Sequence, residues 1–144
     1  DGDGLATRNQ PFVKDGQLVS YLLSTYSGRK LGLPSTANAG GARNVFVSHG
    51  QQDQAALLKQ MGTGLLVTEL MGQGLNMVTG DYSRGAGGYW VENGEIRFPV
   101  QEVTIAGNLR DMYRNLVAIG SDLDTRGSIR TGSVLLEQMK VAGS

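Results

Sequence analysis

Short apolar segments alternate with turn signals along the whole chain, which is typical of a β-rich domain with a few helices. The clearest signal is Asn93-Gly94 between aromatic and β-branched residues, which predicts a β-hairpin because both positions tolerate the positive φ of a tight turn. Asp15-Gly16 predicts an earlier hairpin in the same way. Pro99 lacks an N–H and is expected to open or bulge the strand that contains it. Further strands are expected at residues 44–48, 64–71, 75–79, 100–105, 116–120 and 134–141.

Two short helices are expected between these strands. Asp53 can cap the free amides of a helix over residues 53–61, and Gly62 ends it. Asn108 caps a second helix that runs to about Asn115. Residues 25–31 can form one further helical turn.

These elements together predict an α+β, β-rich fold, with an antiparallel sheet in two layers and two short helices. At 144 residues the chain is expected to form a single domain over 1–144. It begins with Asp1 instead of Met and shows no signal peptide, so we expect a piece of a longer protein.

Composition narrows the classes of function. Thirteen Lys and Arg balance thirteen Asp and Glu, which disfavours binding to nucleic acid or to a membrane surface through a bulk positive charge. The apolar runs are too short for a membrane span. The 22 glycines indicate many turns and close backbone contacts. With no cysteine, the chain can form neither a disulfide framework, a thiolate metal site nor a cysteine nucleophile.

His49 and the segment 1–4 could take part in hydrolysis or metal binding, but a purely structural role is the simpler interpretation of each. His49 is the only histidine, and without a G-x-S-x-G nucleophile motif it is interpreted as an ordinary residue at a strand end. An independent hydrolase that uses His49 stays open as an alternative. Asp1-Gly2-Asp3-Gly4 resembles the start of a calcium loop, but the later ligands are missing, so a turn is expected.

The most unusual stretch is the glycine-rich segment 74–88, which lies between two predicted strands. No helix is expected to start there, so neither type of phosphate-binding loop is supported. One interpretation is a structural crossover in which Asp81 and Arg84 pair locally. The other is an exposed loop beside an edge strand, which can bind an extended peptide through main-chain pairing near residues 75–79 or 100–105. The candidate peptide-binding or chamber residues are Asn76, Thr79, Gly80, Asp81, Tyr82, Ser83, Arg84 and Gly85.

Several motifs together resemble the C-terminal region of the PmbA/TldD family, the modulators of DNA gyrase, over nearly the whole chain. They are D-G-Q-L at 15–18, R-K-L-G at 29–32, S-T-A-N-A-G-G at 35–41, V-T-E-L-M-G-Q-G at 67–74, T-G-D-Y-S-R-G-A-G-G-Y-W-V-E-N-G-E-I at 79–96 and T-I-A-G-N-L at 104–109.

This resemblance implies a part in proteolysis. Members of the family form a heterodimer of two similar subunits. The TldD type carries zinc on an H-E-x-x-x-H helix plus a cysteine, whereas the PmbA (TldE) type lacks these ligands and completes the chamber. The implied substrates are unfolded or small peptides, including peptide antibiotic precursors and an antitoxin, and the link to gyrase is indirect. The implied location is the cytoplasm.

The missing cysteine decides the expected subtype. A TldD-type chain should hold a Cys-Gly step after the stretch that here is Gly120-Ser121-Asp122-Leu123, and none follows. The chain therefore resembles the PmbA type, with no catalytic residue and no cofactor of its own, and zinc in the TldD-type partner. The alternative is a stand-alone interaction module that contacts gyrase or another protein without proteolysis.

Overall fold

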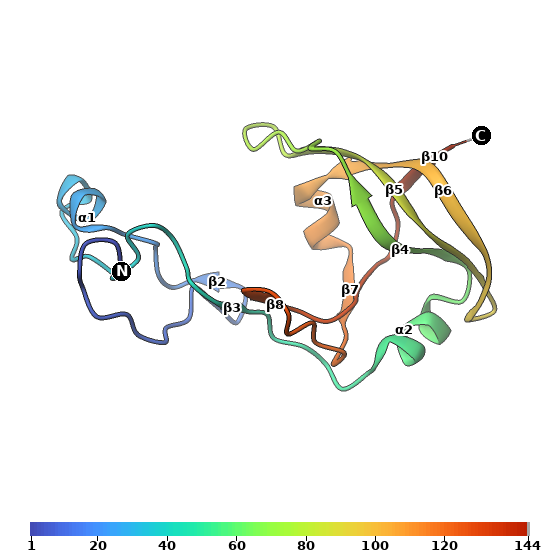
Figure 1. Cartoon of the computed structure of the whole chain (residues 1–144), viewed down its shortest axis with the longest axis horizontal. Helices are drawn as coiled ribbons and strands as arrows, with labels where there is room; N and C mark the ends of the chain where they lie inside the picture. Colours follow the sequence, from blue (N-terminus) through green and yellow to red (C-terminus); the bar gives the residue numbers. More distant parts are fainter. Residues whose placement is uncertain (144) are drawn as a thin grey trace. The chain divides into compact units, whose positions relative to one another are not determined.

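The computed structural model describes residues 1–143, which form two compact units. The first unit is Asp1–Val45, and the second begins at Phe46. The expected α+β, β-rich class is confirmed, with helices and several antiparallel sheets (Figure 1). The strands are distributed over one four-stranded sheet and three two-stranded sheets.

The first unit contains one hairpin and one helix. Strands β1 (Val13–Lys14) and β2 (Gln17–Leu18) pair as predicted. Their turn has positive φ at both Asp15 (51°) and Gly16 (75°), which explains the Asp-Gly sequence. Local signals at residues 15–16 were therefore sufficient for this element.

Helix α1 (Thr25–Leu31) covers the residues predicted to form a helical turn. Ser24 and Ser27 form a reciprocal capping box, and the Asp3 carboxylate accepts hydrogen bonds from the Thr25 N–H at 2.8 Å and the Thr25 hydroxyl at 2.7 Å. Gly32 ends the helix at a φ of 67°. The capping by Asp3 comes from 22 residues upstream, so local sequence gave no sign of it.

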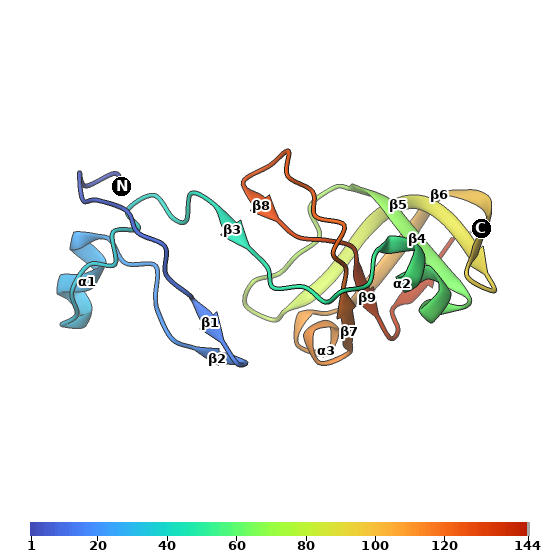
Figure 2. The ribbon, with the colours of Figure 1, turned by 90° about the horizontal axis from the view of Figure 1, so that it is seen from below.

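The second unit is built on an antiparallel sheet in the order β10-β6-β5-β4. Its strands are β4 (Gly64–Met71), β5 (Asp81–Glu92), β6 (Glu95–Asn108) and β10 (Lys140–Ala142). Figures 1 and 2 show the long strands β5 and β6 side by side and the loop after β4 projecting from the end of the sheet. The unit also contains α2 (Gln54–Met61), α3 (Leu109–Arg114), β7 (Leu116–Ile119), β8 (Ile129–Arg130) and β9 (Val134–Leu136). The two residues of β3 (Val45–Phe46) are the last residue of the first unit and the first residue of the second.

Both predicted helices of this unit are confirmed, together with their caps. The Asp53 side chain accepts from the Ala56 N–H, and Gly62 follows the last residue of α2. The Asn108 side chain accepts from the Arg110 N–H at the start of α3. Side-chain caps are local signals, which is why the sequence placed both helix starts.

The hairpin at Asn93-Gly94 is also confirmed, with φ of 55° and 76°. Pro99 pairs with Tyr89, so the pairing of β6 is not interrupted there, but the register shifts on either side of this pair place extra residues in β6, which is bulged as expected. Strand β10 covers β6 only at Thr104, Ile105 and Ala106. In the described residues Pro99 thus lies where the outer side of β6 has no neighbouring strand, a position that tolerates proline.

Two strand predictions need correction. Residues 75–79 form a loop with a single bridge between Leu75 and Tyr82, because the Asn76 side chain accepts from the N–H groups of Val78 and Thr79 and closes a turn. The stretch 134–141 is divided between β9, which pairs with β7, and β10, which pairs with β6. Residues 75–79 therefore offer no strand edge, and the edge in this region is β4.

The core of the sheet is small and depends on glycine. Ala86, Val103 and Ile105 are buried and pack against Leu65, Val67, Tyr82, Val100 and Met139. A Cβ at Gly88 would overlap the backbone carbonyl of Leu66 on β4, so a side chain here would push the two strands apart. No helix among residues 1–143 is long and apolar enough to cross a membrane.

The close contact at Gly88 gives the first prediction. Gly88→Ala in the full-length protein should lower the free energy of unfolding by about 1–3 kcal/mol, because the methyl group must displace the β4 backbone. Urea unfolding followed by circular dichroism measures the change. Gly127→Ala is the control, since its Cβ would come no closer than 3.9 Å to the Ile129 nitrogen. Equal stability of the two variants would show that β4 and β5 are not held this closely.

Candidate functional site

The predicted site residues lie in the loop after β4 and at the start of β5. The Thr79 hydroxyl donates to the Asp81 carboxylate at 2.7 Å, and the Gly80 N–H donates to the Asn76 carbonyl at 2.8 Å. Gly80 has a φ of 79°, which glycine adopts without strain. The structure thus brings Asn76, Thr79, Gly80 and Asp81 together in one hydrogen-bonded turn.

Asn108 ties this turn to the start of α3. Its side-chain N–H group donates to the Thr79 carbonyl at 3.0 Å and to the Asp81 carboxylate at 3.3 Å. The Leu109 N–H donates to the Gly80 carbonyl at 2.8 Å. The hydrogen bonds from Thr79 and then Asn108 lower the pKa of Asp81, so its carboxylate form is favoured. Local sequence predicts Asn108 only as a helix cap, because its contact with the loop depends on the register of β5 with β6.

The other predicted residues divide between the two faces of the sheet. Tyr82 packs on the buried core, and Arg84 follows it two residues later on the same side. Ser83 and Gly85 alternate with them and point the opposite way. The eight candidates therefore form a turn and the first residues of a strand, and they do not converge on one point.

The expected local pair of Asp81 with Arg84 does not form. Residues three apart on a strand point to opposite faces, and Asp81 is bonded to Thr79 and Asn108 instead. The Arg84 guanidinium reaches across to β4, where Nη2 lies 3.5 Å from the Leu70 carbonyl oxygen.

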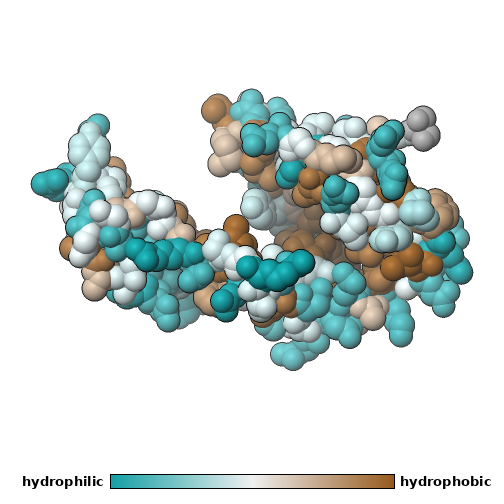
Figure 3. All heavy atoms as spheres, in the orientation of Figure 1, coloured by the Kyte–Doolittle hydropathy of each residue, from teal (hydrophilic) through white to brown (hydrophobic). Residues whose placement is uncertain are grey.

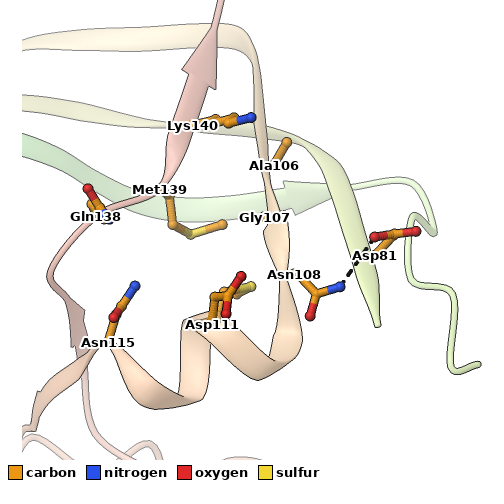
Figure 4. A pocket seen from close by; sticks show the side chains of 10 residues that line it. Asp81, Ala106, Gly107, Asn108, Asp111, Asn115, Gln138, Met139 and Lys140 are labelled. Carbon is orange, nitrogen blue, oxygen red and sulfur yellow. Dashed lines mark hydrogen bonds between the residues drawn. The ribbon is translucent and has the colours of Figure 1, made fainter. Parts of the chain in front are cut away.

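A pocket of about 520 Å³ lies between the end of β6, α3 and β10 (Figure 4). Figure 4 shows Asp111 and Asn115 pointing from α3 toward Met139, with the Asp81–Asn108 hydrogen bond at one side. The pocket could not be predicted from local patterns because its lining residues come from three segments that are far apart in the sequence. The lining residues are Asp81, Ala106, Gly107, Asn108, Asp111, Met112, Asn115, Gln138, Met139 and Lys140.

Strand β4 forms the free edge of the sheet. In the described part of the chain it pairs only with β5, so its outer N–H and C=O groups face no other strand over Gly64–Met71. Leu70 and Met71 at its end are 42% and 40% exposed, and Leu75 in the following loop is 44% exposed. An open edge next to exposed apolar side chains can pair with an extended polypeptide.

Neither of the remaining candidates assembles a metal or hydrolytic site. His49 is exposed, and its Nδ1 lies 2.7 Å from the Gly50 carbonyl oxygen. Asp1 accepts from the N–H groups of Asp3 and Leu5, which makes the N-terminal segment a turn. Among residues 1–143 no three His, Cys, Asp or Glu side chains come together.

The link between Asn108 and Asp81 gives the second prediction. Asn108→Asp keeps the acceptor that caps α3 but replaces the donor to Asp81 with a second carboxylate. At neutral pH the two like charges should loosen residues 74–81, and protonation in acid should restore them. Hydrogen exchange read by mass spectrometry measures this in the full-length protein. Gln101→Glu, at an exposed position of β6, adds the same charge as a control. Exchange that stays unchanged at every pH would contradict the contact.

The chain is similar to known proteins along nearly its whole length. The model of the PmbA/TldA metallopeptidase C-terminal domain matches residues 1–143. Metalloprotease PmbA of Escherichia coli O157:H7 is 57% identical over 143 residues, which are 99% of this chain and 32% of that protein. The Metalloprotease PmbA homolog of Haemophilus influenzae is 54% identical over 145 residues, which are 100% of this chain and 32% of that protein. The chain thus spans about a third of the length of these curated relatives.

Solved structures agree with this result. The crystal structure of a modulator of a DNA gyrase from Thermotoga maritima has a TM-score of 0.90 and 36% identity, and it covers 99% of this chain and 35% of that one. The crystal structure of a modulator of DNA gyrase from Bacteroides thetaiotaomicron has a TM-score of 0.89 and 32% identity. It covers 100% of this chain and 32% of that one. A Metalloprotease TldD homolog of Buchnera aphidicola is 21% identical over 136 residues, 85% of this chain and 28% of that protein. The chain therefore belongs to the PmbA/TldD family and corresponds to its metallopeptidase C-terminal domain.

Proposed function

We propose that this chain is the C-terminal domain of a PmbA (TldE)-type subunit, which pairs with a TldD-type paralogue to form a zinc metallopeptidase. In this proposal the two compact units together form that domain. The TldD-type partner holds the zinc, and this chain contributes the wall of the peptide chamber and contacts between the subunits. The substrates are unfolded or small peptides in the cytoplasm, and any effect on gyrase is indirect.

The observation that carries the proposal is the open edge of β4. Eight residues, Gly64–Met71, have a strand on one side only within the described residues. Main-chain pairing at such an edge binds extended peptides with little dependence on their sequence, as unfolded substrates require. The names of the relatives, which are metalloproteases, support the link from peptide binding to proteolysis.

The other candidate edge from the sequence, residues 100–105 of β6, is less open to pairing with a peptide. Strand β10 already covers Thr104, Ile105 and Ala106 of β6. The remaining outer side of β6, residues 95–103, contains Pro99, which cannot donate a hydrogen bond to an added strand. We therefore assign peptide pairing to β4.

The proposed location of the zinc in the TldD-type partner gives the third prediction. The full-length chain alone should show no turnover of a casein-like peptide, while the chain mixed with its TldD-type paralogue should cleave it. Metal analysis should find zinc only in the paralogue, since in this proposal the TldD-type partner holds it. His49→Ala should retain full activity in the mixture, since His49 is exposed and, among residues 1–143, its side chain contacts the carbonyl oxygen of its neighbour Gly50.

Three outcomes would contradict this assignment. Turnover by the isolated chain that His49→Ala abolishes would favour an independent hydrolase. A mixture that cleaves no faster than the paralogue alone, with retained binding to another protein such as gyrase, would favour the stand-alone interaction module. Stoichiometric metal held by side chains of residues 1–143 would overturn the proposed location of the zinc.

The edge of β4 gives the fourth prediction, which uses chemically modified peptides. Successive N–H groups of an added strand point alternately toward and away from β4. N-methylation of three alternate residues on the facing side should weaken binding more than tenfold, at about 0.5–1.5 kcal/mol for each lost hydrogen bond. The same modification on the other alternate set is the matched control and should be tolerated. Fluorescence anisotropy with the assembled pair in chelator measures both, and equal effects of the two sets would exclude strand addition.

A further inference from the structure

Arg84 is a cation on the buried face of the sheet. It lies on β5 between Tyr82 and Ala86, and its partner across to β6 is Ile105. All three neighbours belong to or pack on the core cluster. An arginine at such a position is removed from part of its hydration, so its N–H groups need acceptors from protein or ligand.

The described residues do not supply those acceptors. The Nε atom of Arg84 is buried and has no hydrogen-bond partner. Nη2 makes a single long contact of 3.5 Å with the Leu70 carbonyl oxygen. Among residues 1–143 Arg84 takes part in no salt bridge, whereas Arg97 pairs with Glu92 and Glu95. A planar guanidinium with free donors is the group that binds a carboxylate in a bidentate manner.

The Arg84 guanidinium lies close to the open edge of β4. Its contact with Leu70 brings it across β5 to the end of β4, the edge strand. The exposed side chains of Leu70, Met71 and Leu75 follow in the same part of the chain. Figure 3 shows that apolar side chains are also exposed elsewhere on the surface of the second unit. A charge among apolar groups interacts strongly with an opposite charge because little water screens it.

The Nε atom of Arg130 is also buried without a hydrogen-bond partner, but the surroundings of Arg130 do not indicate a ligand. Its guanidinium lies 5.1 Å from the centre of the Phe46 ring, so an aromatic face already compensates part of its lost hydration. No ring contact of this kind is found for Arg84 among the described residues.

We infer that Arg84 binds a carboxylate of the extended peptide that pairs with β4. The site would therefore prefer peptides with a free C-terminal carboxylate or an acidic side chain near the Leu70 end of β4. This inference rests on the proposed function, because the peptide must occupy the edge for its carboxylate to reach Arg84. A peptide is the occupant that combines main-chain pairing with the complementary charge.

The experiment compares peptides that differ in one carboxylate. The assembled full-length pair is held in chelator, and anisotropy measures three labelled peptides of one neutral sequence. The first has a free C-terminus, the second a C-terminal amide, and the third an amide plus one Gln→Glu replacement. The wild type should bind either the first or the third peptide about tenfold more tightly than the second. Tighter binding of the first peptide identifies the C-terminal carboxylate as the bound group, and tighter binding of the third identifies the acidic side chain.

Variants of Arg84 then assign the preference to this residue. Arg84→Gln should abolish the preference for the carboxylate peptide over the amide peptide, and Arg84→Lys should keep part of this preference as a point charge. Arg97→Gln removes an equal charge at an exposed position and should leave the preference intact. The affinity of each variant for the amide peptide also reports whether it is folded.

The outcomes separate this inference from the proposed function. Equal binding of all three peptides to the wild type, with the N-methyl effect still present, would overturn the role of Arg84 and leave strand addition standing. A preference that survives in Arg84→Gln would also overturn it. If no peptide binds the assembled pair, both the proposed function and this inference are wrong.

Discussion

The antiparallel pairing of β5 with β6 is the constraint on which the second unit depends. It runs from Asp81 opposite Asn108 to Glu92 opposite Glu95, and the other two strands of the sheet are added to its sides. At one end the Asn93-Gly94 turn closes the hairpin. At the other end the register places Asn108 where it can hold both the loop after β4 and the start of α3.

The same pairing explains why the free edge is where it is. Gly88 lets the backbone of β4 approach β5 closely, and β10 occupies only a short part of β6. Strand β4 therefore keeps one unpaired side over its eight residues in the described chain, and Arg84 extends from β5 toward the end of β4. A surface of this kind binds through the main chain first and adds selectivity with one charge.

Sequence predicted the parts of the fold that depend on local signals. Asn93-Gly94, Asp15-Gly16 and the Asp53 cap each specify an element within a few residues, and all three are present. Residues 75–79 alternate like a strand, but the side chain of Asn76 closes a turn that competes with pairing. Family resemblance predicted the domain type, which the comparisons show.

The candidate site was only partly predictable. The segment containing Asn76, Thr79 and Asp81 was identified from its unusual composition, and it does form one turn. The pocket beside α3 and the orientation of Arg84 depend on how β5, β6 and β10 pair across many residues, and the bulges in β6 shift that register. No local pattern encodes such pairing, so sequence alone could not place these side chains.

The central claim is that the outer edge of β4 pairs with a peptide, and amide hydrogen exchange tests it most directly. In the assembled full-length pair, saturating peptide should slow exchange within Gly64–Met71 at alternate residues, while the central pairing of β5 with β6 stays unchanged. Protection that appears elsewhere in the pair and leaves Gly64–Met71 unaffected would contradict the account.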